Sequence, residues 1–356
     1  IYGQPDTRQF PLATWRSAAN WLHGGGRDPA WVIDHIDQDV PMLIEQIRTR
    51  VLPKRGIVAA PDEILITLGS QNALYLLTRL LLSSTTRIGV ENPCFREAIN
   101  TFLLADAEVV PHPVDEEGIV LNERPCDYYY VTPGHQVPTG VTMSSARRRQ
   151  LLEHAARHDA VIIEDDYDSE SNFTLNPLPA LKASDRSGRV VYVSSLSKAL
   201  SPGLRLGFMV ADPDLIDEAR ALRRLVYRHP PTNIQYQMAH FLAQGHYETH
   251  LRRYHYDSAQ RWERLHAALQ RYLPSCRALA GSEHANAFWL QTPAQINTQQ
   301  LTWRAAHAGV LIEPGARHFL SAAPPDNYFR MGFHAINPDA IAQGVEVLRG
   351  QLEQMG

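Results

Sequence analysis

The chain has 356 residues, of which 44% are hydrophobic, so it is long enough to bury a large core. Its formal net charge of −4 and its pI near 6.5 give no general reason to expect nucleic-acid binding. It contains no run of 18 apolar residues, the length that a membrane-spanning helix requires. Three cysteines without a disulfide pattern, Cys94, Cys126 and Cys276, indicate a reducing compartment, and we expect a cytoplasmic protein.

The alternation of apolar runs with polar turns predicts an α/β chain in three parts. Residues 1–30 are expected to form an N-terminal arm. Residues 31–250 are expected to form a large subdomain, with strands near residues 64, 87, 108, 128, 161, 190 and 206. A long helix over 245–272 then leads into a smaller α/β subdomain, residues 251–356. The three arginines at 147–149 are interpreted as a solvated helix face.

A glycine-hydroxyl turn follows the first of these strands. The strand at 64–67 leads through Leu68-Gly69-Ser70-Gln71-Asn72 into an apolar helix at 73–82. The free N–H groups and positive dipole end of such a helix suit a phosphate, although many α/β turns contain Gly-Ser. Phe95 comes just after the next strand, where it could stack on a flat ring or be ordinary core.

A string of carboxylates ends the strand near residue 161. The string is Glu164-Asp165-Asp166-Tyr167-Asp168, and the apolar run before it is typical of a buried parallel strand. A solvated loop or a divalent-metal site is the alternative interpretation. No His or Cys cluster and no Asp-x-Asp-x-Asp-Gly calcium loop accompanies the string, so we expect no metal.

Lys198 is the most informative residue, because it follows the strand near 190 in a hydroxyl-rich turn, Ser195-Leu196-Ser197-Lys198, with Arg205 seven positions on. This pattern predicts a lysine held as an imine on pyridoxal 5′-phosphate (PLP), with the hydroxyls and Arg205 on the phosphate. PLP needs a carboxylate partner for its pyridine nitrogen. Asp165 lies 33 residues earlier, about one strand-helix-strand unit, so both residues are expected at the carboxyl edge of the sheet.

Three further strings add to these motifs: Tyr130-Val131-Thr132-Pro133-Gly134-His135-Gln136-Val137-Pro138-Thr139-Gly140, then Glu164-Asp165-Asp166-Tyr167-Asp168-Ser169-Glu170, and Gly245-His246-Tyr247-Glu248-Thr249-His250-Leu251-Arg252-Arg253. Together the motifs resemble fold-type-I PLP enzymes, the aspartate aminotransferase superfamily, and more narrowly the PLP-binding domain of MocR/GabR transcription regulators. The resemblance runs from about Gly3 to the C-terminus. Aminotransferases usually carry an Asn before Pro-Thr-Gly to bond the ring oxygen. Val137 stands there, so this contact is lost or falls to His135 or Gln136.

The resemblance implies a fold-type-I, aminotransferase-like α/β fold, with a mostly parallel central sheet, helices on both faces and a smaller C-terminal α/β subdomain. It implies that Lys198 forms the internal imine and Asp165 pairs with the pyridine nitrogen. It places Tyr167 on the ring oxygen and Phe95 on the ring face. It assigns the phosphate to Ser70, Gln71, Ser195, Ser197 and Arg205. A homodimer is also implied, but the partner tyrosine that usually reaches the phosphate has no clear match in residues 34–39.

The same resemblance assigns the ligand's acid group to Arg330, whose planar fork suits a carboxylate or a sulfonate. The alternative is an ordinary exposed arginine after a strand. An amine near Lys198 and an acid at Arg330 predict a small zwitterion as ligand. γ-Aminobutyrate, taurine, diaminobutyrate derivatives and α-amino acids all fit. Residues 89–97 and 228–233 look most like regulators of ectoine utilisation, in which ring-opened ectoine products would react and intact ectoine would not.

Two functions follow from the resemblance. In the first, the chain is the effector-sensing domain of a regulator. An amino compound forms an external aldimine with PLP in place of Lys198, and this changes how an attached helix-turn-helix binds DNA. In the second, it is a free-standing aminotransferase. The regulator-specific strings favour the sensor. Because the first residue is Ile1 rather than Met, we expect an N-terminal winged helix-turn-helix to be missing from this chain.

Overall fold

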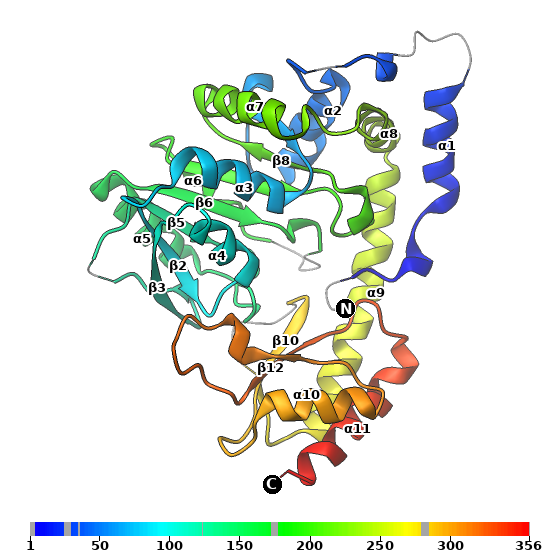
Figure 1. The fold of residues 1–356 in the computed structure, drawn as a ribbon. Helices are drawn as coiled ribbons and strands as arrows, with labels where there is room; N and C mark the ends of the chain where they lie inside the picture. The colour runs from blue at the N-terminus through cyan, green and yellow to red at the C-terminus, as the bar shows by residue number, and fades with distance from the viewer. Residues whose placement is uncertain are drawn as a thin grey trace.

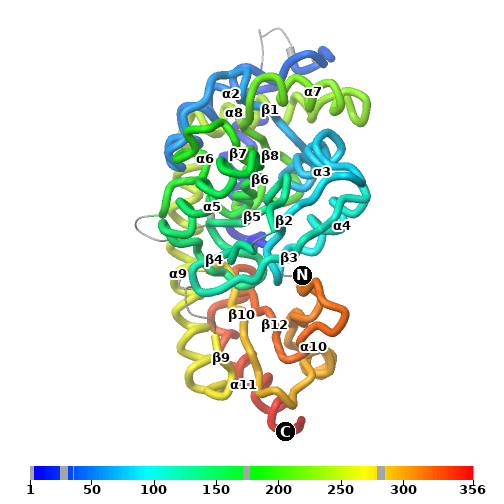
Figure 2. The backbone as a smooth tube through the Cα atoms, turned by 90° about the vertical axis from the view of Figure 1, so that its left-hand side faces the viewer, coloured from blue at the N-terminus to red at the C-terminus, as the bar shows by residue number. Residues whose placement is uncertain are grey.

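The structure is a computed structural model that describes residues 4–24, 30–34, 36–122, 124–171, 177–278 and 285–355. A large α/β part and a smaller α/β part share one long helix, α9 (His246–Tyr272), which runs along one side of both (Figures 1 and 2). Residues 1–3 and 25–29 of the predicted arm lie outside the described residues. Among the helices in these ranges, none combines the length and apolar character that crossing a bilayer requires.

The large part is built around a sheet whose described strands lie in the order β1-β8-β7-β6-β5-β2-β3-β4. The run from β7 to β3 is parallel, whereas β8 is antiparallel to both β7 and β1, and β4 is antiparallel to β3. The strands are β1 (Ile64–Thr67), β2 (Arg87–Asn92), β3 (Glu108–Asp115), β4 (Gly118–Ile119), β5 (Tyr128–Val131), β6 (Val161–Asp166), β7 (Val190–Ser195) and β8 (Gly207–Val210). The seven strands predicted for this part are all present.

Helices cover both faces of this sheet, which explains why its central strands are apolar without alternation. In β5, Tyr129 is buried in the core beneath α5, whereas the adjacent Tyr130 is buried in the core beneath α3 and α4. The helices of the chain are α1 (Leu12–His23), α2 (Pro41–Gln46), α3 (Ser70–Leu81), α4 (Arg96–Leu103), α5 (Ser145–His158), α6 (Leu181–Ser184), α7 (Pro213–Tyr227), α8 (Thr232–Ala243), α9, α10 (Thr298–His307) and α11 (Ile341–Glu353).

The smaller part has an antiparallel sheet in the order β11-β12-β10-β9. Its strands are β9 (Arg277–Ala278), β10 (Ala287–Gln291), β11 (Glu313–Pro314) and β12 (Tyr328–Gly332). The helix α9 joins the two parts, since Tyr247 and Leu251 pack in the large core and Leu265 and Leu269 in the small one. The predicted boundary at residue 250 therefore falls inside a continuous helix.

The arginines at the start of α5 do not form the solvated face that we predicted. Arg148 is buried, and its guanidinium donates to the backbone oxygens of Met143, Pro179 and Pro133 at 2.8–2.9 Å. Arg147 donates to the Asp115 carboxylate at 2.8 Å. Arg148 therefore ties the loop before α5 to the segment before α6, a role that a run of like charges does not reveal.

Candidate cofactor and ligand site

A cavity of about 250 Å³ is lined by residues at the carboxyl edge of the large sheet and by Arg330 of the smaller part. The strands β1, β6 and β7 end at this edge, because β8 runs opposite to both of its neighbours. Ten of the eleven residues predicted for the site line the cavity: Ser70, Gln71, Phe95, Asp165, Tyr167, Ser195, Ser197, Lys198, Arg205 and Arg330. This edge is where open α/β sheets bind their ligands.

Lys198 supplies the amine of the cavity. It lies three residues beyond the end of β7, is half-buried, and its Nζ atom is 5.5 Å from the centre of the Tyr167 ring. Burial lowers the pKa of this amine, and the nearby Arg330 lowers it further, although Asp168 and Asp165 act in the opposite direction. A lowered pKa favours the neutral amine, which is the nucleophilic form.

Asp165 presents a carboxylate to the same cavity from β6. Its Oδ2 atom accepts from the Tyr130 hydroxyl at 2.8 Å, while Oδ1 is buried with no hydrogen-bond partner among the described residues. Burial raises the pKa of this carboxyl to about 7. A buried acceptor without a donor is costly, so the site is built for a donor that comes from outside the chain. A protonated pyridine nitrogen is such a donor.

The other carboxylates of the string point elsewhere, because side chains alternate between the two faces of a strand. Glu164 accepts from the backbone N–H groups of Leu181 and Lys182, and Asp166 pairs with Arg55 at 2.7 Å. The four carboxylates therefore do not converge as metal ligands. Over the described ranges, no group of three His, Cys, Asp or Glu side chains has the arrangement of a metal site.

The opposite end of the cavity has the features of an anion cradle. Helix α3 begins at Ser70 after Gly69, whose φ of +85° is left-handed. A Cβ atom at Gly69 would lie 2.8 Å from Arg205 Nη2, and this nitrogen donates to the Leu68 oxygen at 2.8 Å. Glycine is thus required for Arg205 to reach the helix N-terminus. Together they offer a guanidinium and free N–H groups, which suit a phosphate.

The serines after β7 differ in what they do. The Ser197 hydroxyl donates to the Leu206 oxygen at 2.9 Å and accepts from the Leu206 N–H at 2.7 Å, so it mainly holds the turn together. Ser195 Oγ accepts from the Ser197 N–H at 3.2 Å. Gln71 donates to Thr101 Oγ1 at 3.1 Å, which directs its amide toward α4.

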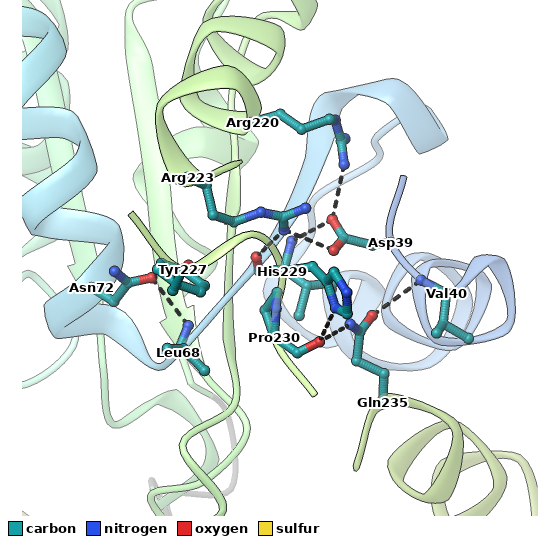
Figure 3. Close-up of polar contacts among 11 residues, drawn as sticks. Asp39, Val40, Leu68, Asn72, Arg220, Arg223, Tyr227, His229, Pro230 and Gln235 are labelled. Atoms are coloured by element: carbon teal, nitrogen blue, oxygen red, sulfur yellow. Dashed lines mark hydrogen bonds and ion pairs between the residues drawn. The ribbon is translucent and has the colours of Figure 1, made fainter. Parts of the chain in front are cut away.

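A side chain of α7 contacts the turn of residues 68–72, at the N-terminus of α3 (Figure 3). The Asn72 Oδ1 atom accepts from both the Leu68 N–H and the Tyr227 hydroxyl. Deeper in, the fully buried Arg223 donates to Asp39 Oδ1 at 2.7 Å and to the Ile66 oxygen at 2.6 Å. The position of the cavity's helix N-terminus therefore depends on a buried ion pair that does not touch the cavity.

Arg330 defines the end of the cavity in the smaller part. It lies on β12, is 7% exposed, and faces Glu313 on β11, with which it is directly paired in the strand register. The distance from Arg330 Nη1 to Glu313 Oε2 is 3.7 Å. This burial argues against the alternative of an ordinary exposed arginine.

His135 is the one predicted site residue that does not line the main cavity. It lines a smaller adjacent cavity, and its Nδ1 atom is 3.0 Å from Asp168 Oδ2, which also accepts from Asn286. The Tyr167 hydroxyl donates to the His135 backbone oxygen at 3.2 Å. Sequence reasoning did not identify Tyr130, Asp168, Asn286, Glu313 or His318 as part of this region. Asp168 lies inside the carboxylate string and Tyr130 opens the string that runs to Gly140, so these two had a signal that could have found them.

The chain matches the aminotransferase class I and II family over residues 37–348. It is 38% identical over 349 residues to the HTH-type transcriptional regulator TauR of Rhodobacter capsulatus, covering 97% of the chain and 72% of TauR. It is 33% identical over 355 residues to the probable rhizopine catabolism regulatory protein MocR of Rhizobium meliloti, covering 98% and 71%.

Among solved structures, Pyrococcus horikoshii kynurenine aminotransferase, in complex with PMP, has a TM-score of 0.91 and 26% identity, covering 99% of this chain and 89% of that one. The predicted fold-type-I aminotransferase-like fold is thereby confirmed, and these relationships indicate that the chain binds PLP. The open oxygen of Asp165 and the cradle at Gly69 fit that cofactor. The chain therefore belongs to the aminotransferase class I and II family, as the aminotransferase-like domain of a MocR/GabR-type transcription regulator.

Proposed function

We propose that this chain is the effector-sensing domain of its regulator, in which a small amino compound takes the place of Lys198 on PLP. The observation that carries the proposal is the 38% identity to a helix-turn-helix regulator over 97% of the chain. The cavity supports it, because the half-buried amine of Lys198 and the buried guanidinium of Arg330 line the same space. A free-standing aminotransferase would use the same first step, but the curated regulators above match the chain at higher identity than the solved aminotransferase does.

When bound, PLP supplies an aldehyde carbon that combines with primary amines. Lys198 would attach to it, Asp165 would hold the ring nitrogen, and Phe95 would lie against the ring. Tyr167 would lie toward the ring oxygen. The phosphate would be held by Arg205 and by residues of the two turns: Ser70, Gln71, Ser195 and Ser197. His135 would not contact the cofactor directly, because it lies outside the main cavity. It would act through its contact with Asp168.

The ligand that this arrangement would select is a small zwitterion. Its amine would approach Lys198, whose lowered pKa favours exchange between neutral amines. Its acid would be held by Arg330, for which the guanidinium fork gives two-point contact. The candidates remain γ-aminobutyrate, taurine, diaminobutyrate derivatives and α-amino acids. If the ectoine subgroup is correct, ring-opened ectoine products belong to this set.

Contact with DNA would be made by an N-terminal helix-turn-helix. TauR is named an HTH-type transcriptional regulator, which supports a helix-turn-helix as the DNA-binding element. Occupation of the cavity would change how the two parts of the chain, or the subunits of a homodimer, sit relative to each other. That change would bias the DNA-bound state in proportion to the difference in ligand affinity between the two states.

The test is the visible absorption spectrum of the PLP-loaded chain with a panel of amino compounds and a keto-acid acceptor. Lys198→Ala should change or abolish the yellow band. A sensor should show a single spectral shift that persists, with no more than one equivalent of keto product. Product that accumulates over many equivalents would show an aminotransferase and overturn the proposal.

A further inference from the structure

Gln4, in the N-terminal arm, lies at the boundary between the main cavity and a neighbouring cavity of about 390 Å³. Of the described residues, Gln4 and Arg330 are the two that line both cavities. Gln4 is exposed, and the amide of a glutamine can donate two N–H bonds and accept at its oxygen. A residue of the arm is therefore placed at the same boundary as the guanidinium proposed to hold the acid of the effector.

A buried ion pair holds the arm next to this boundary. Asp6 is 7% exposed, and its Oδ2 atom accepts from Arg261 Nη2 on α9 at 2.9 Å. Arg261 is 4% exposed, and its Nε atom donates to the Ile336 backbone oxygen at 2.9 Å. Ile336 lines the neighbouring cavity and lies four residues after the end of β12, the strand that carries Arg330. The contact between Asp6 and Arg261, termed the arm latch, thus joins the arm to the segment that follows Arg330.

Further contacts fix the short segment that contains Asp6. The Arg8 guanidinium donates to both oxygens of the Asp6 carboxylate, at 2.9 and 2.8 Å, and the Arg8 N–H donates to Oδ1 at 3.1 Å. Gln9 donates to the Asp257 carboxylate on α9 at 2.7 Å. Because Asp6 lies two residues after Gln4, the position of Gln4 depends on these contacts with α9.

The rest of the arm is attached to the large part of the chain. Helix α1 lies along α8 (Figure 1), and Gln237 on α8 donates to the Trp15 backbone oxygen at 2.9 Å. The Trp15 ring packs edge to face on Phe241, and Trp21 stacks on His240 with ring centres 4.0 Å apart. The arm therefore contacts both parts, so a change in their relative position would act on the arm latch.

We propose that Gln4 is a second contact for the acid group of the effector, beside Arg330, and that the arm latch positions it. A carboxylate has about four lone-pair sites, and a bidentate guanidinium occupies two of them, so the acid can also accept from the Gln4 amide. This inference rests on the proposed sensing function and adds to it a residue that selects acids. Since the proposed helix-turn-helix would precede the arm, the same contact would couple cavity occupation to the arm, and this coupling is reciprocal.

The first experiment measures Kd by spectral titration of the PLP-loaded chain with 4-aminobutyrate and with n-propylamine, which lacks the carboxylate. The ratio of the two Kd values reports the acid preference. The variants are Gln4→Ala, Arg261→Gln and the double variant. The matched control is Arg264→Gln, three residues further along α9, whose pair with Asp339 has side chains 50% and 84% exposed. Thermal unfolding and PLP content show which variants are folded and loaded, and Asp6→Asn replaces Arg261→Gln if that variant does not fold.

The wild type should prefer 4-aminobutyrate. Gln4→Ala should lower this preference by about tenfold, the value of one hydrogen bond to a charged group. Arg261→Gln should lower it by a similar factor, because the arm no longer holds Gln4 at the boundary. The double variant should be no lower than either single variant, since both changes remove the same contact. Arg264→Gln should match the wild type.

The second experiment follows the arm by limited digestion with trypsin, which cleaves after arginine. The Arg8 side chain is 66% exposed, and mass spectrometry would report the rate of cleavage after it. Where opening is fast relative to cleavage, this rate follows the fraction of chains with a released arm. Saturating 4-aminobutyrate should slow cleavage of the wild type by about tenfold, the same factor as its gain in affinity, and should not slow it in Gln4→Ala.

An unchanged preference in Gln4→Ala would overturn the contact. Losses that multiply in the double variant, or an equal loss in Arg264→Gln, would overturn the positioning role of the arm latch. Cleavage after Arg8 that 4-aminobutyrate does not slow would overturn the coupling. A wild type that responds to both amines without any acid preference would refute this inference and leave the sensing proposal standing, whereas a wild type that responds to neither would refute both.

Discussion

The buried ion pair between Asp39 and Arg223 offers a quantitative test of how the site is supported (Figure 3). Both side chains are 0% exposed, and Asp39 Oδ2 also accepts from the Ile66 N–H at 3.1 Å and from Arg220 at 3.1 Å. Asp39→Ala would leave the Arg223 charge buried without its anion. Removal of one partner of such a pair typically costs about 3–5 kcal/mol of unfolding free energy.

A matched control lies five residues earlier in the same segment. Asp34 pairs with Arg228 just after α7, but these side chains are 48% and 58% exposed, so solvent screens the pair and Asp34→Ala should cost far less stability than Asp39→Ala. The assay is urea unfolding followed by tryptophan fluorescence. Asp39→Ala should also weaken PLP binding, because the Asp39 network holds Ile66, two residues before the turn at Leu68.

The double variant Asp39→Leu with Arg223→Met separates charge from packing. Apolar replacement of both partners removes the buried charge, so it should recover most of the stability lost in Asp39→Ala. If Asp39→Ala costs no more than Asp34→Ala, the buried pair does not support the site, and the argument from Figure 3 fails.

Three further predictions concern the cavity itself. In the cofactor-free chain, the pKa of Asp165 is raised to about 7 in the folded state. The folded chain therefore holds a proton that the unfolded chain has lost, and the free energy of unfolding decreases as the pH rises from about 4 to 7. Asp165→Asn should flatten this part of the curve of Tm against pH. Gly69→Ala should reduce PLP affinity, because the added Cβ would lie 2.8 Å from Arg205 Nη2. Gly245→Ala is the control: its φ is also positive, +71°, but the added Cβ would contact no atom within 4 Å. It should cost only about 1 kcal/mol of stability and keep PLP affinity. Tyr130→Phe removes the donor to Asp165 and should raise the pKa of that carboxyl further, which would move the Tm transition to higher pH.

Local patterns in the sequence were sufficient for most of the fold. The strand at 64–67 and the turn at Gly69 predicted a helix over 73–82, and the structure has α3 over Ser70–Leu81, which begins three residues earlier than predicted. Asp212 and Pro213 form the N-cap and first turn of α7, since the Asp212 side chain accepts from the Asp214 N–H at 3.0 Å. These features depend on neighbouring residues only, so they can be recognised from the sequence.

The candidate site was predictable where its residues follow strands. Asp165 and Lys198 both come at or just after the ends of neighbouring parallel strands, β6 and β7, and such ends meet at one edge of a sheet. Strand periodicity alone did not tell which carboxylate of the string faces the cavity. The resemblance to a known family selected Asp165, and its open Oδ1 atom agrees with that choice.

Only the tertiary structure decided which distant segments pair with each other. Arg148 appeared solvated in a run of arginines, but the fold brings three backbone oxygens to its guanidinium. Asp39 and Arg223 are 184 residues apart, and Cys94 and His318 are 224 apart. The amino-acid order determined the elements and the chemistry at their ends, because hydrophobic period and turn residues act locally. Which buried charge meets which partner depends on how the elements pack, and that information is not local to any segment.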